Sequence, residues 1–153
     1  MKPSGRPLSR DDQALLACIR EGRPPADGFG HRQHLRAAWL YLQAHDFEQA
    51  CTQFCADLQA FATALGAPQM YHHTLTVAAM HVLAAHGNPE HHSFEALLKH
   101  CPALETDFRA LIGRHFSPEL LATDRARQQW VNPDRAALPM PGTFANQTGP
   151  SGR

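Results

Sequence analysis

The sequence predicts an all-α protein, a single-domain helical bundle of about four main helices followed by short helices near the C-terminus. Apolar residues recur at spacings of three and four through stretches without proline or glycine, and no segment alternates as a half-buried strand does. Glycine and proline clusters separate these stretches and mark helix ends. We expect one helical domain over residues 9–137, between a flexible N-terminus (1–8) and a disordered tail (138–153).

The first two predicted helices have clear boundaries. Ser9 can cap the first helix, whose first turn is acidic, and Gly22 ends it. The second helix runs from His31 to Ala44, a stretch that no glycine or proline interrupts.

The third and fourth predicted helices are bounded in the same way. Asp46 caps the third helix, and Gly66 ends it in the left-handed conformation. The fourth helix follows Pro68 and runs from about Gln69 to His86. We expect helices two to four to form an antiparallel set. The third helix carries an apolar stripe at spacings of four and three: Phe47, Cys51, Phe54, Leu58, Phe61 and Leu65.

Shorter helices are predicted over 94–99 and 108–115 and in a segment that starts after Glu119 and ends near Trp130. They are expected to wrap the bundle. A turn follows, in which Asp134 is predicted to bond nearby backbone amides; the alternative is an aspartate that orients a histidine.

Composition disfavours several classes of partner. The 153 residues contain 14 basic and 14 acidic ones, and the basic residues form no stripe, so a nucleic-acid partner is not expected. The chain shows neither a signal peptide nor an apolar run of about 18 residues, which predicts a cytoplasmic protein without a membrane partner.

The four irregularly spaced cysteines are expected to be reduced. A homodimer stays open, because periodicity does not show which apolar stripe is covered.

Histidines provide the candidate site. His31 and His34 are three residues apart on the second helix and share a face, and a second pair, His72 and His73, precedes Thr74. Adjacent helical residues point about 100° apart, so only one histidine of the second pair should reach the same centre. We choose His72, although spacing alone does not decide between the two.

Three neutral imidazoles can bind a divalent metal ion, iron or zinc, with one position open to water or substrate. Glu48 is a candidate fourth ligand. Tyr71 and Thr74 are candidate donors or proton-transfer groups, and Arg36 is a candidate anchor for a carboxylate. These residues predict a metal-dependent enzyme that acts on a small molecule, with hydrolytic and oxygenase chemistry both open.

Other interpretations of the same residues remain. The histidines can equally hydrogen-bond one another in a non-enzymatic helical module that binds a small ligand or a protein partner. Cys51 and Cys55 lie one turn apart within the apolar stripe and are expected to be core residues rather than ligands. The Glu-x-x-His, His-Glu-x-x-His, phosphate-loop and Gly-x-Ser-x-Gly motifs are all absent from the sequence.

Three blocks carry a family resemblance: FGHRQHLRAAW over 29–39, YHHTLT over 71–76 and ARQQWVNPD over 126–134, the last followed by Leu-Pro at 138–139. Together they resemble a family of small, largely uncharacterised bacterial helical proteins. The resemblance runs from about residue 9 to residue 139. It implies that His31, His34 and His72, rather than His73, are the site positions, and it implies no particular reaction.

Overall fold

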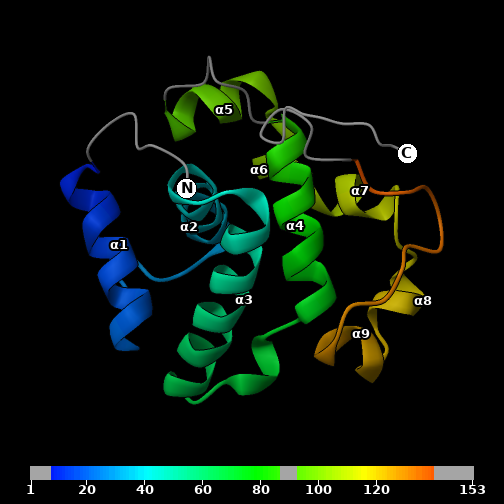
Figure 1. The fold of residues 1–153 in the computed structure, drawn as a ribbon, viewed down its shortest axis with the longest axis horizontal. Helices are drawn as coiled ribbons and strands as arrows, with labels where there is room; N and C mark the ends of the chain where they lie inside the picture. The colour runs from blue at the N-terminus through cyan, green and yellow to red at the C-terminus, as the bar shows by residue number, and fades with distance from the viewer. Residues whose placement is uncertain (1–7, 87–92, 140–153) are drawn as a thin grey trace. The chain divides into compact units, whose positions relative to one another are not determined.

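The computed structural model describes residues 8–86 and 93–139, and the chain divides into two compact units, residues 1–72 and 73–153. The described residues form helices and no strands, which confirms the all-α prediction (Figure 1). The predicted single domain over 9–137 stays a prediction. Most of the predicted flexible N-terminus and disordered tail lies outside the described residues.

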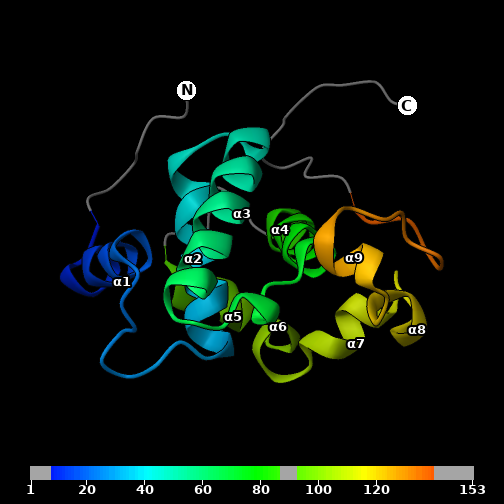
Figure 2. The ribbon, with the colours of Figure 1, turned by 90° about the horizontal axis from the view of Figure 1, so that it is seen from below.

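The first unit contains α1 (Arg10–Glu21), α2 (His31–Ala44), α3 (Phe47–Ala64) and the short 3-10 helix η1 (Pro68–Met70). The three α-helices pack against one another, and the two-residue connection between α2 and α3 makes them antiparallel neighbours (Figure 2). These bounds agree with the first three predicted helices.

Caps explain why these helices begin and end where they do. The Ser9 side chain accepts a hydrogen bond from the Asp12 amide at 3.0 Å, and Asp46 accepts one from the Gln49 amide at 3.0 Å. Gly22 has a positive φ of 72° and caps the end of α1. Gly66 (φ 79°) does so just beyond α3, as predicted.

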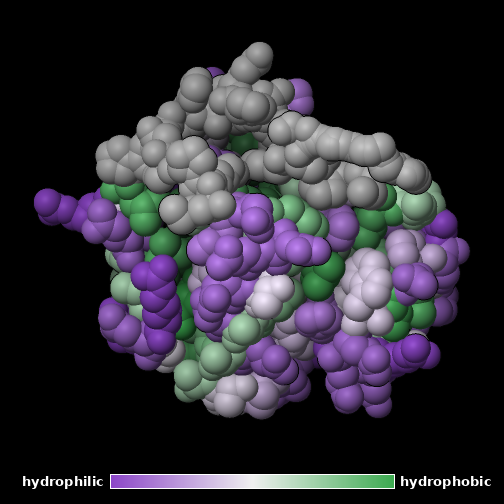
Figure 3. Space-filling view, viewed as in Figure 1, coloured by the Kyte–Doolittle hydropathy of each residue, from purple (hydrophilic) through white to green (hydrophobic). Residues whose placement is uncertain are grey.

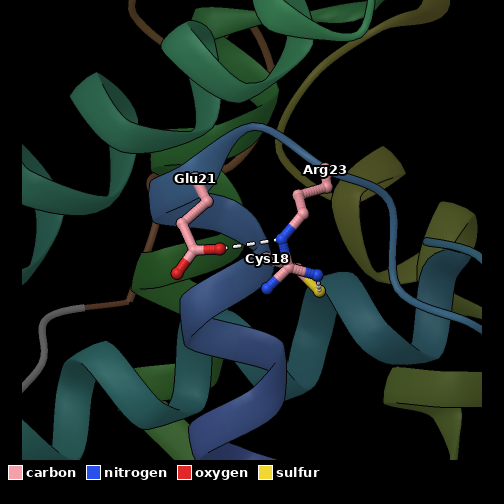
Figure 4. Close-up of polar contacts among 3 residues, drawn as sticks. All are labelled: Cys18, Glu21 and Arg23. Atoms are coloured by element: carbon pink, nitrogen blue, oxygen red, sulfur yellow. Dashed lines mark hydrogen bonds and ion pairs between the residues drawn. The ribbon is translucent and has the colours of Figure 1, made fainter.

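The chain turns back over the end of α1 after Gly22 (Figure 4). The Arg23 guanidinium donates from Nε to Oε1 of Glu21 at 2.7 Å and from Nη1 to Sγ of Cys18 at 3.6 Å. The Arg23 amide also donates to the Cys18 carbonyl at 3.0 Å. Because both charged side chains are more than half exposed, the ion pair contributes little to stability, and the backbone bonds define the turn.

The core of the first unit is built mainly from α2 and α3. Of the predicted stripe on α3, Phe54, Leu58 and Phe61 are buried, whereas Leu65 is 40% exposed because it lies at the end of the helix. Helix α2 is buried on most of its circumference, through Leu35, Ala37, Ala38, Trp39, Leu40, Tyr41 and Leu42.

The second unit is centred on α4, which packs against α7 and α9 (Figure 2). Its fully covered side chains include Phe94, Phe116 and Leu104. Within the described residues its helices are α4 (His73–His86), α5 (Phe94–His100), α6 (Ala103–Thr106), α7 (Phe108–Gly113), α8 (Pro118–Leu121) and α9 (Asp124–Gln128).

Two predicted boundaries in this part of the chain were wrong. The fourth helix begins at His73 instead of Gln69, because Tyr71 is extended and separates it from η1. The helix predicted to run from about residue 119 to Trp130 is two helices, because Thr123 is extended and its hydroxyl accepts from the Ala126 amide to start a new one. Helix α6 was not predicted.

Asp134 binds back to the start of α8. Its carboxylate accepts from the Ser117 amide at 2.8 Å and from the Ser117 hydroxyl at 2.6 Å, and these bonds lower the pKa of Asp134. Asp134 therefore bonds a backbone amide, as predicted, but the amide belongs to a residue 17 positions earlier in the sequence and not to the local turn.

The surface in the view of Figure 3 is mainly hydrophilic over the described residues, with hydrophobic residues showing between the hydrophilic ones. Met70 in η1, at 74% exposure, is the most exposed large apolar side chain among those described. None of the described helices combines the length and apolarity needed to cross a membrane.

Candidate functional site

His34 lies near the start of α2 with aromatic rings around it. Its imidazole stacks on the Phe29 ring, with centroids 5.9 Å apart, and meets the Phe54 ring at 5.7 Å and 65°. Phe29 in turn contacts Phe61, with ring centroids 5.0 Å apart. Phe29 belongs to the loop before α2, whereas the other two phenylalanines belong to α3, so this loop and α3 together cover His34.

The Nε2 atom of His34 is buried and has no hydrogen-bond partner among the described residues. Burial, and then the charge of nearby His31, lower the pKa of His34 from 6.5 to about 4. The imidazole is therefore neutral at pH 7, and Nε2 offers either a lone pair or an N–H, depending on the tautomer. A buried polar atom without a partner has lost its hydrogen bonds to water, which makes His34 a candidate for contact with a ligand.

His31 is exposed and is the first residue of α2. The charge of His31 lowers the pKa of His34, which is consistent with the shared helix face that their spacing predicts. The cap position before it is Gly30, which provides no side-chain bond, and the first turn of α2 contains no acidic residue. The positive end of the helix dipole is thus left for a polar or anionic group to approach.

His72 and His73 lie on either side of the division between the units. His72 follows η1 at the end of the first unit, and His73 is the first residue of α4. Both are half-buried and both make contacts. That His72 joins His31 and His34 stays a prediction.

Glu48, the proposed fourth metal ligand, is exposed in the first turn of α3. The ring that contacts His34 from α3 belongs to Phe54. Glu48 lies six residues before Phe54, which corresponds to about 9 Å along the helix axis. Across residues 8–86 and 93–139, no group of three or more His, Cys, Asp or Glu side chains is arranged to hold a metal ion. The metal set stays a prediction.

Tyr71 is buried, with 8% of its surface exposed, and its side chain hydrogen-bonds the Cys55 thiol. Burial raises the pKa of Cys55 and raises that of Cys51 to about 12, so both thiols stay protonated. These cysteines are unreactive residues of α3, and the hydroxyl of Tyr71 is engaged with one of them.

Arg36 is held by an ion pair within the first unit. Its Nε donates to Oδ1 of Asp12 on α1 at 2.8 Å, and both side chains are mostly covered. An anchor for a substrate carboxylate would have to share this guanidinium with Asp12.

Thr74 is fully buried in α4 and has a clear structural partner. Its hydroxyl donates to the Gln129 carbonyl at 2.7 Å and accepts from the Val131 amide at 3.2 Å. The hydroxyl thereby fixes the backbone on both sides of Trp130. Its predicted role as a donor to substrate is untested.

One hydrogen-bonded pair between α2 and α3 was not predicted from the sequence. The Tyr41 hydroxyl on α2 donates to Oδ2 of Asp57 on α3 at 2.6 Å, and Gln53 donates to the other carboxylate oxygen at 3.1 Å. Burial and then the bond to Asp57 raise the pKa of Tyr41. Tyr41 lies seven residues, about two turns, after His34 on the same side of α2, but no local pattern shows which residue of another helix it meets.

None of the protein families, curated proteins or solved structures with which this chain was compared matches it. The resemblance carried by the three sequence blocks therefore stays a prediction.

Proposed function

We propose that residues 1–72 bind a small molecule through Nε2 of His34. The observation that supports this proposal is the buried Nε2 atom, which lacks a hydrogen-bond partner in the described part of the chain. A polar atom in that position costs free energy until a ligand group pairs with it. A bound ligand would offset this cost.

The surroundings indicate the chemistry of the ligand. The neutral imidazole accepts or donates one hydrogen bond, and the rings of Phe29 and Phe54 beside it favour a planar or apolar body. The uncapped start of α2, next to His31, favours an acidic or hydrogen-bond-accepting group on the ligand. Small carboxylic acids and amides with one aromatic ring meet these requirements.

The test uses protein labelled with ¹⁵N at its histidine rings, because the nitrogen shifts report tautomer and hydrogen bonding. Such acids and amides are titrated into three proteins: the native protein, the His34→Leu variant and the His45→Gln variant. His45→Gln is the control, because His45 lies at the other end of α2. We expect saturable shifts of the His34 nitrogens in the native protein and in His45→Gln, with the same compounds failing to bind His34→Leu. Unchanged His34 signals across the whole set would contradict the proposal.

A metal-dependent enzyme is the second candidate, and the closeness of His31 and His34 favours it. With His72 these residues would supply three imidazoles to iron or zinc, and Glu48 is the remaining candidate ligand. A bound ion would supply Lewis acidity or activate water.

Elemental analysis of untagged protein tests this candidate, with His34→Ala and His72→Ala dialysed identically. Near-stoichiometric metal in the native protein that is lost in both variants would support the shared centre. Metal-free native protein after reconstitution with Fe²⁺ and with Zn²⁺ would contradict it.

A further inference from the structure

A cavity beside Trp130 in the second unit provides a site that does not depend on the proposal for His34. Its volume is about 340 Å³, near the lower end of the range for small-molecule sites. The residues that line it are Leu120, Thr123, Arg125, Trp130, Val131 and Asn132. They come from α8, from α9 and its N-cap residue Thr123, and from the segment that follows α9.

Trp130 is held firmly as one wall of the cavity. The Phe116 ring packs edge-to-face against it, with centroids 5.9 Å apart and planes at 85°. The backbone on either side of Trp130 is also fixed, because the Gln129 carbonyl and the Val131 amide both hydrogen-bond the buried hydroxyl of Thr74. A fixed aromatic wall favours binding, because little side-chain entropy remains to be lost.

The groups around the cavity indicate an aromatic anion. The Trp130 Nε1 group already donates to Oδ1 of Asn132 at 3.2 Å, so the indole offers its ring surface to a ligand. Leu120 and Val131 add apolar lining. Arg125 is exposed at the cavity, and within the described chain its side chain makes no hydrogen bond or ion pair. Its guanidinium can therefore pair with a carboxylate.

A second cavity, of about 280 Å³, is also lined by Trp130, together with His81 and Arg135. There the cation is already engaged, because Nη1 of Arg135 donates to the Gly113 carbonyl at 2.8 Å. Of these two cavities, the first, which we name the Arg125 cavity, is the one with an available positive charge.

We propose that the Arg125 cavity binds a small aromatic carboxylate, with its ring against Trp130 and its carboxylate on Arg125. The two parts of the ligand act together, since the ring provides contact area and the charge provides selectivity over neutral aromatic molecules.

Benzoate is the first probe, and benzyl alcohol is its uncharged counterpart. The chain has two tryptophans, Trp39 and Trp130, so a ¹⁵N–¹H spectrum shows two indole N–H signals, which Trp39→Phe assigns. We expect benzoate to shift the Trp130 signal saturably, with an affinity about two- to fivefold above that of benzyl alcohol, the range for one charged pair at an exposed site.

The variants test the role of the charge. Arg125→Gln should lose about two- to fivefold in benzoate affinity and bind benzyl alcohol as before. Arg109→Gln changes an exposed arginine of α7 outside the cavity and should match the native protein. Equal binding of the two probes, an Arg125→Gln variant that binds benzoate normally, or an unmoved Trp130 signal would each overturn the proposal. Shifts confined to the His34 nitrogens would support only the first site.

Discussion

Burial of an imidazole links the protonation of His34 to folding. Its pKa is about 4 in the folded chain and near 6.5 when unfolded, so protons bind preferentially to the unfolded state between these values. The contribution of His34 to stability is therefore complete above pH 6.5 and falls as the pH drops toward 4. Allowing for the partial exposure of the residue, we expect a loss of about 2 kcal/mol at pH 4.5.

Urea unfolding followed by circular dichroism at pH 7 and pH 4.5 measures this loss. The comparison is with His34→Leu, in which the free energy of unfolding should fall less over the same interval because the titrating group is gone. Equal pH dependence in the two proteins would mean that His34 is solvated in the folded state.

Thr74 gives a second prediction. Thr74→Val keeps the shape of the side chain but leaves the Val131 amide and the Gln129 carbonyl without their hydroxyl partner. Because both hydrogen bonds are only partly buried, each contributes about 0.5–1.5 kcal/mol, so the free energy of unfolding should fall by about 1–3 kcal/mol. Thr74→Ser, which keeps the hydroxyl, should lose less than Thr74→Val in thermal unfolding, and the opposite order would show that the methyl group matters more.

Sequence spacing identified His34 as a candidate but could not identify its surroundings. That His31 and His34 share a face follows from helix geometry, which is local. The Phe29 and Phe54 contacts bring together residues from a loop and another helix, and Thr74 meets residues more than 50 positions away. Such contacts depend on how helices pack, which the period of one helix does not specify.

The close approach of α1 and α3 gives a third prediction. Gly22 has φ +72°, and a Cβ there would lie 2.7 Å from Cβ of Ala64. Gly22→Ala therefore combines left-handed strain, about 1 kcal/mol, with a clash that costs about 1–3 kcal/mol. Gly28→Ala is a matched control, because Gly28 has φ +84° and nothing within 4 Å of such a Cβ. Chemical denaturation should show the larger loss for Gly22→Ala; equal losses would mean that the end of α1 shifts freely.

Helix boundaries were predictable where a single residue decides them. Ser9, Gly22 and Asp46 act as caps whichever way the helices later pack, so the limits of α1 to α3 could be inferred from sequence. Thr123 was ambiguous, since threonine can stand inside a helix or cap one, and the break before α9 was missed. The start of α4 was missed because the residues after Pro68 form a separate 3-10 turn.

Composition determines how the whole chain responds to pH. The formal charge is zero at pH 7 with histidines neutral, so mutual repulsion between molecules is weakest there. The chain has eleven histidines, and the ordinary pKa of a histidine is about 6.5. Lowering the pH to about 5.5 therefore adds several positive charges to the chain. This holds even though burial lowers the pKa of His34, His81 and His86. We expect solubility in ammonium sulfate to be lowest near pH 7 and higher at pH 5.5. Turbidity measured across this range tests the expectation, and a solubility minimum at pH 5.5 would show that exposed apolar surface, rather than net charge, controls self-association.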